Sequence, residues 1–111
     1  MKNQRKMALL AAAMLEEFPD LVSGYVVDAR VESLNLTGRV FKAFGYRNGA
    51  CLVSTEIAQL MHFSPDRWAI KTDADDFFVI ASFAPRGRQS VESLAEKFEA
   101  ARLSHSQWHL H

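Results

Sequence analysis

Residues 77–83 have the sequence FFVIASF, and this segment constrains the fold more than any other. Both alternating sets of positions are apolar, so a strand here would have no face suited to water. Pro85 ends the segment, because proline cannot donate to a strand ladder. We therefore predict that residues 77–83 form a central strand, and that residues 86–88 after it are a flexible connection.

The chain is long enough for one hydrophobic core and too short for two. Its 111 residues fit a single domain, which we place at residues 1–104, followed by a C-terminal tail at residues 105–111. Hydrophobic residues make up 49% of the chain and charged residues 23%, which is typical of a globular protein and not of a disordered one.

The first strand is predicted within residues 24–36. Val27, Ala29 and Val31 alternate there with charged residues, which indicates a strand with one face in water. Thr37-Gly38 predicts the turn that follows.

A second strand follows over residues 39–46, where aromatic and β-branched side chains predominate. Asn48-Gly49 then lies between two apolar segments, which is a strong signal for a hairpin with a type I′ turn. We therefore expect this strand and the next one, which ends near Val53, to be antiparallel neighbours.

Helices are predicted at both ends of the chain. The first has an apolar stripe that ends near Phe18, before Pro19, and we favour an amphipathic helix there over a secretory signal. Ser90 is predicted to cap the last helix. The apolar stripe of the last helix consists of Val91, Leu94, Ala95, Phe98 and Ala101.

The middle of the chain allows two interpretations. Ser54 is suited to cap a short helix with Ile57, Leu60 and Met61 on one face. Residues 67–72 then form either a strand or a second helix opened by residues 64–66. We favour the strand. The resulting fold class is α+β, an antiparallel sheet of about five strands in the order α-β-β-β-α-β-β-α, with the helices packed on the sheet.

Residues 54–71 resemble the front of a bacterial helix-turn-helix. Glu56 and Ile57 would pack the first helix, Ala58 would be the small residue at the helix crossing, and Ser64-Pro65 would open a recognition helix. The resemblance implies a DNA-binding regulator that uses segment 54–72. The chain departs from the pattern at His62, where glycine is usual.

Positive and negative side chains cluster at different places. Thirteen basic and thirteen acidic side chains cancel to a net charge of zero, so a nucleic acid or anionic membrane would have to bind a local patch. We take the clustered charges and the nearby tryptophan as candidate partner-binding residues. They are Arg39, Lys42, Arg47, Arg67, Trp68, Lys71, Asp73, Asp75 and Asp76.

The sequence contains no pattern that predicts catalysis, a cofactor or a metal. Cys51 and His62 are the only sequence-near nucleophile and base, and we expect Cys51 to be a buried strand residue instead. Residues 73–76 fit a polar hairpin turn better than a calcium loop. His105, His109 and His111 lie in a tail that would not orient their rings.

These observations lead to two hypotheses. The first is a small non-catalytic protein that regulates or inhibits another protein by covering its surface, since aromatic residues such as Tyr25, Tyr46, Trp68 and Trp108 can contribute to an interface. The alternative is a DNA-binding transcriptional regulator. A homodimer is compatible with both. One cysteine and no apolar run near the ~20 residues of a membrane span predict a cytoplasmic protein without a membrane partner.

Overall fold

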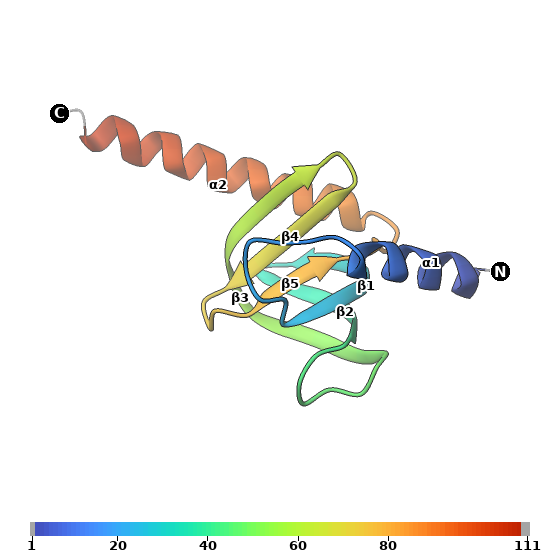
Figure 1. The fold of residues 1–111 in the computed structure, drawn as a ribbon. Coiled ribbons are helices and arrows are strands. Elements are labelled where there is room, and N and C mark those ends of the chain that lie inside the picture. The colour runs from blue at the N-terminus through green and yellow to red at the C-terminus, as the bar shows by residue number, and fades with distance from the viewer. Residues whose placement is uncertain (1, 110–111) are drawn as a thin grey trace.

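The computed structural model describes the backbone of residues 2–109 and the side chains of residues 3–103. Two helices flank five strands (Figure 1). The elements are α1 (Lys2–Met14), β1 (Gly24–Glu32), β2 (Asn35–Phe41), β3 (Ala50–Ser64), β4 (Arg67–Thr72), β5 (Phe77–Ile80) and α2 (Gly87–His109).

The five strands form a closed barrel in which sequence neighbours are spatial neighbours. Each strand is antiparallel to the next one in the chain. An odd number of alternating strands leaves the first and the last pointing the same way, so β1 and β5 close the barrel as a parallel pair. The α+β class and the mainly antiparallel sheet are confirmed, but closure removes the sheet edges that an open sheet would have.

β5 is buried on both faces, as predicted, but it ends at Ile80 and not at the predicted residue 83. Phe78 and Ile80 belong to the cluster inside the barrel, together with residues of all the other strands and of α2. Phe77 and Val79 belong to a second cluster on the outer side, which α1 and the segment after it cover. This strand therefore connects the two hydrophobic clusters.

The predicted helix after Ser54 is wrong, because β3 continues to Ser64. The first half of β3 pairs with β2 and the second half with β4, with register shifts near Ile57. Leu60 packs on the inner cluster and Met61 on the outer one, so they lie on opposite faces. Ser54 caps no helix. Its Oγ accepts the N–H of Leu36 at 2.9 Å and donates to the carbonyl of Thr55 at 2.7 Å.

The strand at residues 67–72 is confirmed as β4, and the two-helix interpretation is wrong. Residues 54–72 form a β-hairpin, so the segment that resembles a helix-turn-helix contains no recognition helix. Trp68 and Ile70 point into the barrel, while Ala69 belongs to the outer cluster. This alternation is the one that a strand requires.

The predicted turn at Thr37-Gly38 is also wrong, since both residues lie within β2. The chain turns earlier, between Glu32 and Asn35, with Ser33 in the left-handed region at φ 57°. Glycine is needed at position 38 because β1 passes close to it. A Cβ there would lie 2.8 Å from the carbonyl oxygen of Val27.

Gly49 closes the loop between β2 and β3. The two strands are antiparallel neighbours, as predicted, but residues 42–49 form a longer loop than a two-residue turn. Gly49 has φ 88°, its N–H donates to the carbonyl of Val40 at 2.8 Å, and the N–H of Lys42 donates to Asn48 Oδ1 at 2.9 Å. The local signal is thus correct for the hairpin and for Gly49, but wrong for the turn type.

We expect Gly49→Ala to lower the free energy of unfolding by about 1 kcal/mol, because alanine resists a positive φ. A Cβ at this position would meet only the ring of Phe41, at 3.7 Å, so the cost comes from the backbone and not from a clash. Urea unfolding of Gly49→Ala and Gly49→Asn measures it. Asparagine tolerates this conformation better, so a larger loss in Gly49→Asn than in Gly49→Ala would contradict the explanation.

Both terminal helices form at the predicted places with shifted ends. α1 ends at Met14, before the predicted Phe18, and buries Leu10 and Ala13. α2 begins at Gly87, so Ser90 lies inside its first turn. There Ser90 Oγ donates to the carbonyl of Gly87 at 2.6 Å and accepts the N–H of Val31 at 2.9 Å, which ties the helix to β1.

α2 packs on the barrel through its first turns and then extends past it (Figure 1). It continues through the predicted tail as far as His109. The tail histidines and Trp108 lie outside the residues whose side chains the structure describes. Neither α1 nor the described part of α2 is long and apolar enough to cross a membrane.

Candidate functional site

Both predicted charge clusters lie at one end of the barrel. β2 and β4 end there, whereas β1, β3 and β5 begin there, so the 42–49 loop and the 73–76 turn are at the same end (Figure 1). Lys42 follows β2 directly, and Asp76 precedes β5 directly. The two side chains line one pocket of about 470 Å³, with Val22 and Phe78 also in its wall.

The acidic turn is held in place by a threonine. The buried hydroxyl of Thr72 accepts the N–H groups of Ala74 at 3.3 Å and Asp76 at 3.2 Å. Asp73 and Asp75 are exposed on this turn, and Asp76 is half-buried beside the pocket. The turn is the polar hairpin that the sequence predicts.

An aromatic loop lies beside this pocket. The Phe44 side chain is fully exposed (102%), although contact of an apolar ring with water is unfavourable. Tyr46 and Val53, which line the same pocket, are also exposed. We call Lys42, Phe44, Tyr46, Val53 and Asp76 the loop surface. Sequence reasoning selected Lys42, Tyr46 and Asp76 but missed Phe44. The signal that could have found Phe44 is the glycine that follows it, because Gly45 favours a loop where we predicted the end of a strand.

Arg39 and Arg47 extend the positive charge of this end. Arg47 is exposed in the loop, and Arg39 is exposed on β2, where it pairs in register with Cys51 of β3. Cys51 is also exposed, so the expected strand position is right and the expected burial is wrong. Among the described residues, neither arginine takes part in an ion pair.

The remaining three candidates lie away from the loop surface. Arg67 is buried: its Nη2 lies 2.6 Å from Glu16 Oε2, and its Nη1 donates to the carbonyl of Ile80 at 2.8 Å. Lys71 is half-buried and lies 3.5 Å from Asp20 Oδ2. Both cations therefore hold the segment after α1 against β4. The structure does not bring them together with Arg39, Lys42 and Arg47.

Trp68 lies under a groove between β3 and α2. The ring of His62 stacks on it at 3.9 Å with an angle of 9° between the planes. Trp68 Nε1 is buried and has no hydrogen-bond partner among the described residues. Arg102 on the helix side of the groove donates to the Glu99 carboxylate and lowers the pKa of Glu99 below its ordinary value.

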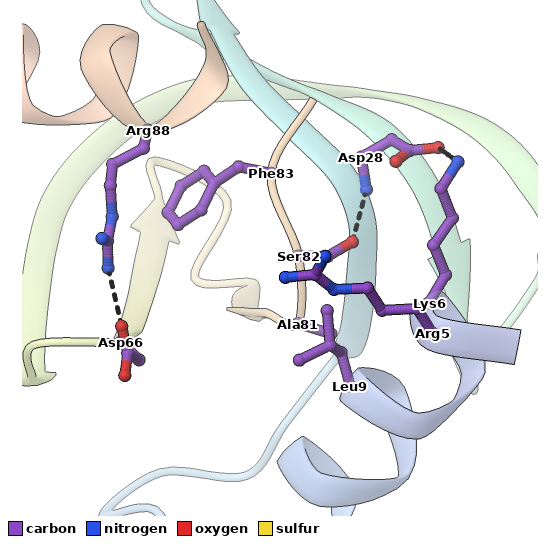
Figure 2. A pocket seen from close by; sticks show the side chains of 9 residues that line it. All are labelled: Arg5, Lys6, Leu9, Asp28, Asp66, Ala81, Ser82, Phe83 and Arg88. Atoms are coloured by element: carbon purple, nitrogen blue, oxygen red, sulfur yellow. Dashed lines mark hydrogen bonds and ion pairs between the residues drawn. The ribbon is translucent and has the colours of Figure 1, made fainter. Parts of the chain in front are cut away.

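A second pocket, of about 600 Å³, lies where α1 meets the segment between β5 and α2 (Figure 2). Asp28, Ser82 and Phe83 line it, together with cationic side chains from both helices. Asp28 occupies a bulge of β1, with φ 55°, and its N–H donates to Ser82 Oγ at 3.0 Å. Sequence reasoning did not select this pocket, because its residues come from five separate parts of the chain.

The residues whose side chains are described include no group of three His, Cys, Asp or Glu side chains placed to hold a metal ion. Comparison with models of protein families, with curated proteins and with solved structures finds no match to this chain. The class that the fold and surface define is therefore a small closed barrel with two helices and an exposed aromatic loop at one end.

Proposed function

We propose that this chain is a non-catalytic binding protein that regulates or inhibits a partner protein through the loop surface. The observation that carries the proposal is the full exposure of Phe44 beside a pocket lined by Lys42 and Asp76. Aromatic side chains next to a pocket are typical of the residues that dominate protein interfaces.

The charges around Phe44 define the chemistry of the partner. Lys42 and Asp76 line the same pocket. The exposed Arg47 belongs to the loop that begins at Lys42, and the exposed Asp73 and Asp75 belong to the turn that ends at Asp76. A complementary segment would present an apolar side chain to the pocket, an acidic group to Lys42 and a basic group to Asp76. Such mixed charges favour one orientation of a bound protein. They do not suit a partner whose surface is uniformly negative.

The alternative, DNA binding, has less support. It would need Arg39, Lys42, Arg47, Arg67 and Lys71 on one face, but Arg67 is buried against Glu16 and Lys71 lies beside Asp20. The segment that would enter a groove is a β-hairpin. We therefore rank a protein partner first and keep duplex DNA as one arm of the test.

The test compares capture by immobilised wild-type protein and by the double variant Phe44→Ala, Tyr46→Ala from a lysate of the source cells. We expect a protein that binds the wild type, and the purified partner should bind the double variant at least about 30-fold more weakly, because a hot-spot residue contributes about 2 kcal/mol or more. Leu15→Ala is the matched control, since Leu15 is also apolar and exposed but follows α1.

Two results would contradict the proposal. One is equal affinity of the double variant and the wild type for the identified partner. The other is salt-sensitive binding of duplex DNA at about 50 mM salt, where electrostatic association is stronger than at physiological salt. Sedimentation of the free protein tests whether it forms a homodimer. If Phe44→Ala dissociates that homodimer, the loop surface is also the interface between the two copies.

A further inference from the structure

The pocket of Figure 2 contains more positive than negative side chains. Three cations line it, Arg5 and Lys6 from α1 and Arg88 from α2, against the carboxylates of Asp28 and Asp66. Lys6 Nζ lies 2.8 Å from Asp28 Oδ2, so these two charges neutralise each other. Arg5 has no ion pair or hydrogen bond among the described residues. One positive charge is therefore left over.

Ser82 adds a free hydroxyl hydrogen to the same pocket. Its Oγ accepts the N–H of Asp28, and the described residues supply no acceptor for its own O–H. Figure 2 draws Arg5 and Ser82 among the side chains that line this pocket. Arg5 and Ser82 therefore both supply hydrogen-bond donors to this pocket, and an anion can accept from them.

Arg88 lines the opposite side of the pocket, where its ion pair with Asp66 is exposed to solvent. Its guanidinium lies 5.6 Å from the ring centroid of Phe83 and donates to the carbonyl of Pro65 and to Asp66 Oδ1, the latter at 3.2 Å. The Asp66 side chain is 92% exposed, so solvent screens this ion pair and its contribution is small. An incoming anion can replace Asp66 on Arg88.

We propose that this pocket binds a small organic anion. Its carboxylate or phosphate head would lie between Arg5 and Arg88 and accept the hydroxyl hydrogen of Ser82, since guanidinium groups pair with both heads. Its apolar body would lie on Phe83, Leu9 and Ala81, which form the uncharged part of the wall. The volume of about 600 Å³ is within the range of small-molecule sites.

The experiment is calorimetric titration of the purified full chain with phenyl phosphate, benzoate and inorganic phosphate at low salt. We expect phenyl phosphate or benzoate to bind at least about tenfold more tightly than inorganic phosphate, because only they cover Phe83. The stronger of the two aryl ligands identifies the head group. Absence of binding by both aryl probes would overturn the proposal.

Substitutions of matched charge locate the site. Arg5→Gln and Arg88→Gln should each weaken aryl-anion binding at least about tenfold, whereas Arg39→Gln, which removes the same charge from exposed β2, should not. Asp66→Asn should strengthen binding more than Asp75→Asn, because only Asp66 competes for Arg88. If Arg39→Gln weakened binding as much as Arg5→Gln and Arg88→Gln, and Asp75→Asn strengthened it as much as Asp66→Asn, the attraction would be unspecific and the site would be refuted.

This site is independent of the loop surface. Arg5 and Arg88 lie on α1 and α2, and no residue lines both pockets. Phe44→Ala should therefore leave aryl-anion binding unchanged, and Arg5→Gln should leave capture of the partner unchanged. Circular dichroism of each variant verifies that it is folded.

Discussion

Phe78→Ala is expected to lower the free energy of unfolding by about 3–5 kcal/mol, the usual cost of truncating a buried phenylalanine. The Phe78 side chain is almost completely buried inside the barrel, and it belongs to the strand that joins the two hydrophobic clusters. A domain of this size is stable by about 5–15 kcal/mol in total. The substitution should therefore remove a large part of the stability, and urea denaturation measures it.

Phe44→Ala is the matched control for this prediction. It removes the same atoms from a ring that is fully exposed, so the free energy of unfolding should change by less than about 0.5 kcal/mol. Comparable losses in the two variants would contradict the burial assigned to Phe78, and a stable Phe78→Ala would contradict the central place of β5. The same Phe44 variant serves in the binding assay, where a loss of affinity without a loss of stability identifies a contact residue.

The parts of the fold that the sequence predicts correctly are those with a strict local signal. Residues 77–80 are apolar at every position, as in a strand that is buried on both faces, and Pro85 limits the length of the segment. Trp68 and Ile70 belong to the inner cluster and Ala69 between them to the outer one, and Gly49 adopts a positive φ. In each case the neighbouring residues determine the conformation.

β3 was predicted incorrectly because its irregularities mimic a helix. The strand changes partners from β2 to β4, and a register shift near Ile57 moves the apolar residues out of period two. Ile57, Leu60 and Met61 then have helical spacing in the sequence although Leu60 and Met61 lie on opposite faces. A bulge depends on the pairing strands, so residues 54–61 alone cannot reveal it.

The candidate site was predicted only in part for a similar reason. Charge clusters are local, so Lys42 and Asp76 were found, and barrel closure explains why they meet. The burial of Arg67 depends on Glu16, 51 residues away in the chain, and the pocket of Figure 2 is built from five separate parts of the chain. Such arrangements arise from tertiary structure, and no local pattern in the sequence predicts them.

Gly87→Ala is expected to destabilise the protein by an amount at the upper end of the range of about 1–3 kcal/mol for overpacking. The sequence suggested a flexible connection at residues 86–88, but Gly87 is buried as the first residue of α2. A Cβ at this position would lie 2.1 Å from the carbonyl oxygen of Ala29 in β1. That oxygen also accepts the N–H of Ala84 at 3.0 Å, so it cannot move away without breaking a hydrogen bond.

Gly45→Ala provides the comparison that separates a clash from backbone strain. Gly45 has φ 85°, and no atom lies within 4 Å of the place that a Cβ would take, so alanine there should cost only about 1 kcal/mol. Urea unfolding of both variants measures the difference. Because α2 contacts the barrel mainly through β1, Gly87→Ala should also increase amide hydrogen exchange in the first turns of α2, and Gly45→Ala should not. If Gly87→Ala were as stable as wild type, the close contact between α2 and β1 would have to be abandoned, and with it the position of Arg88 in the anion pocket.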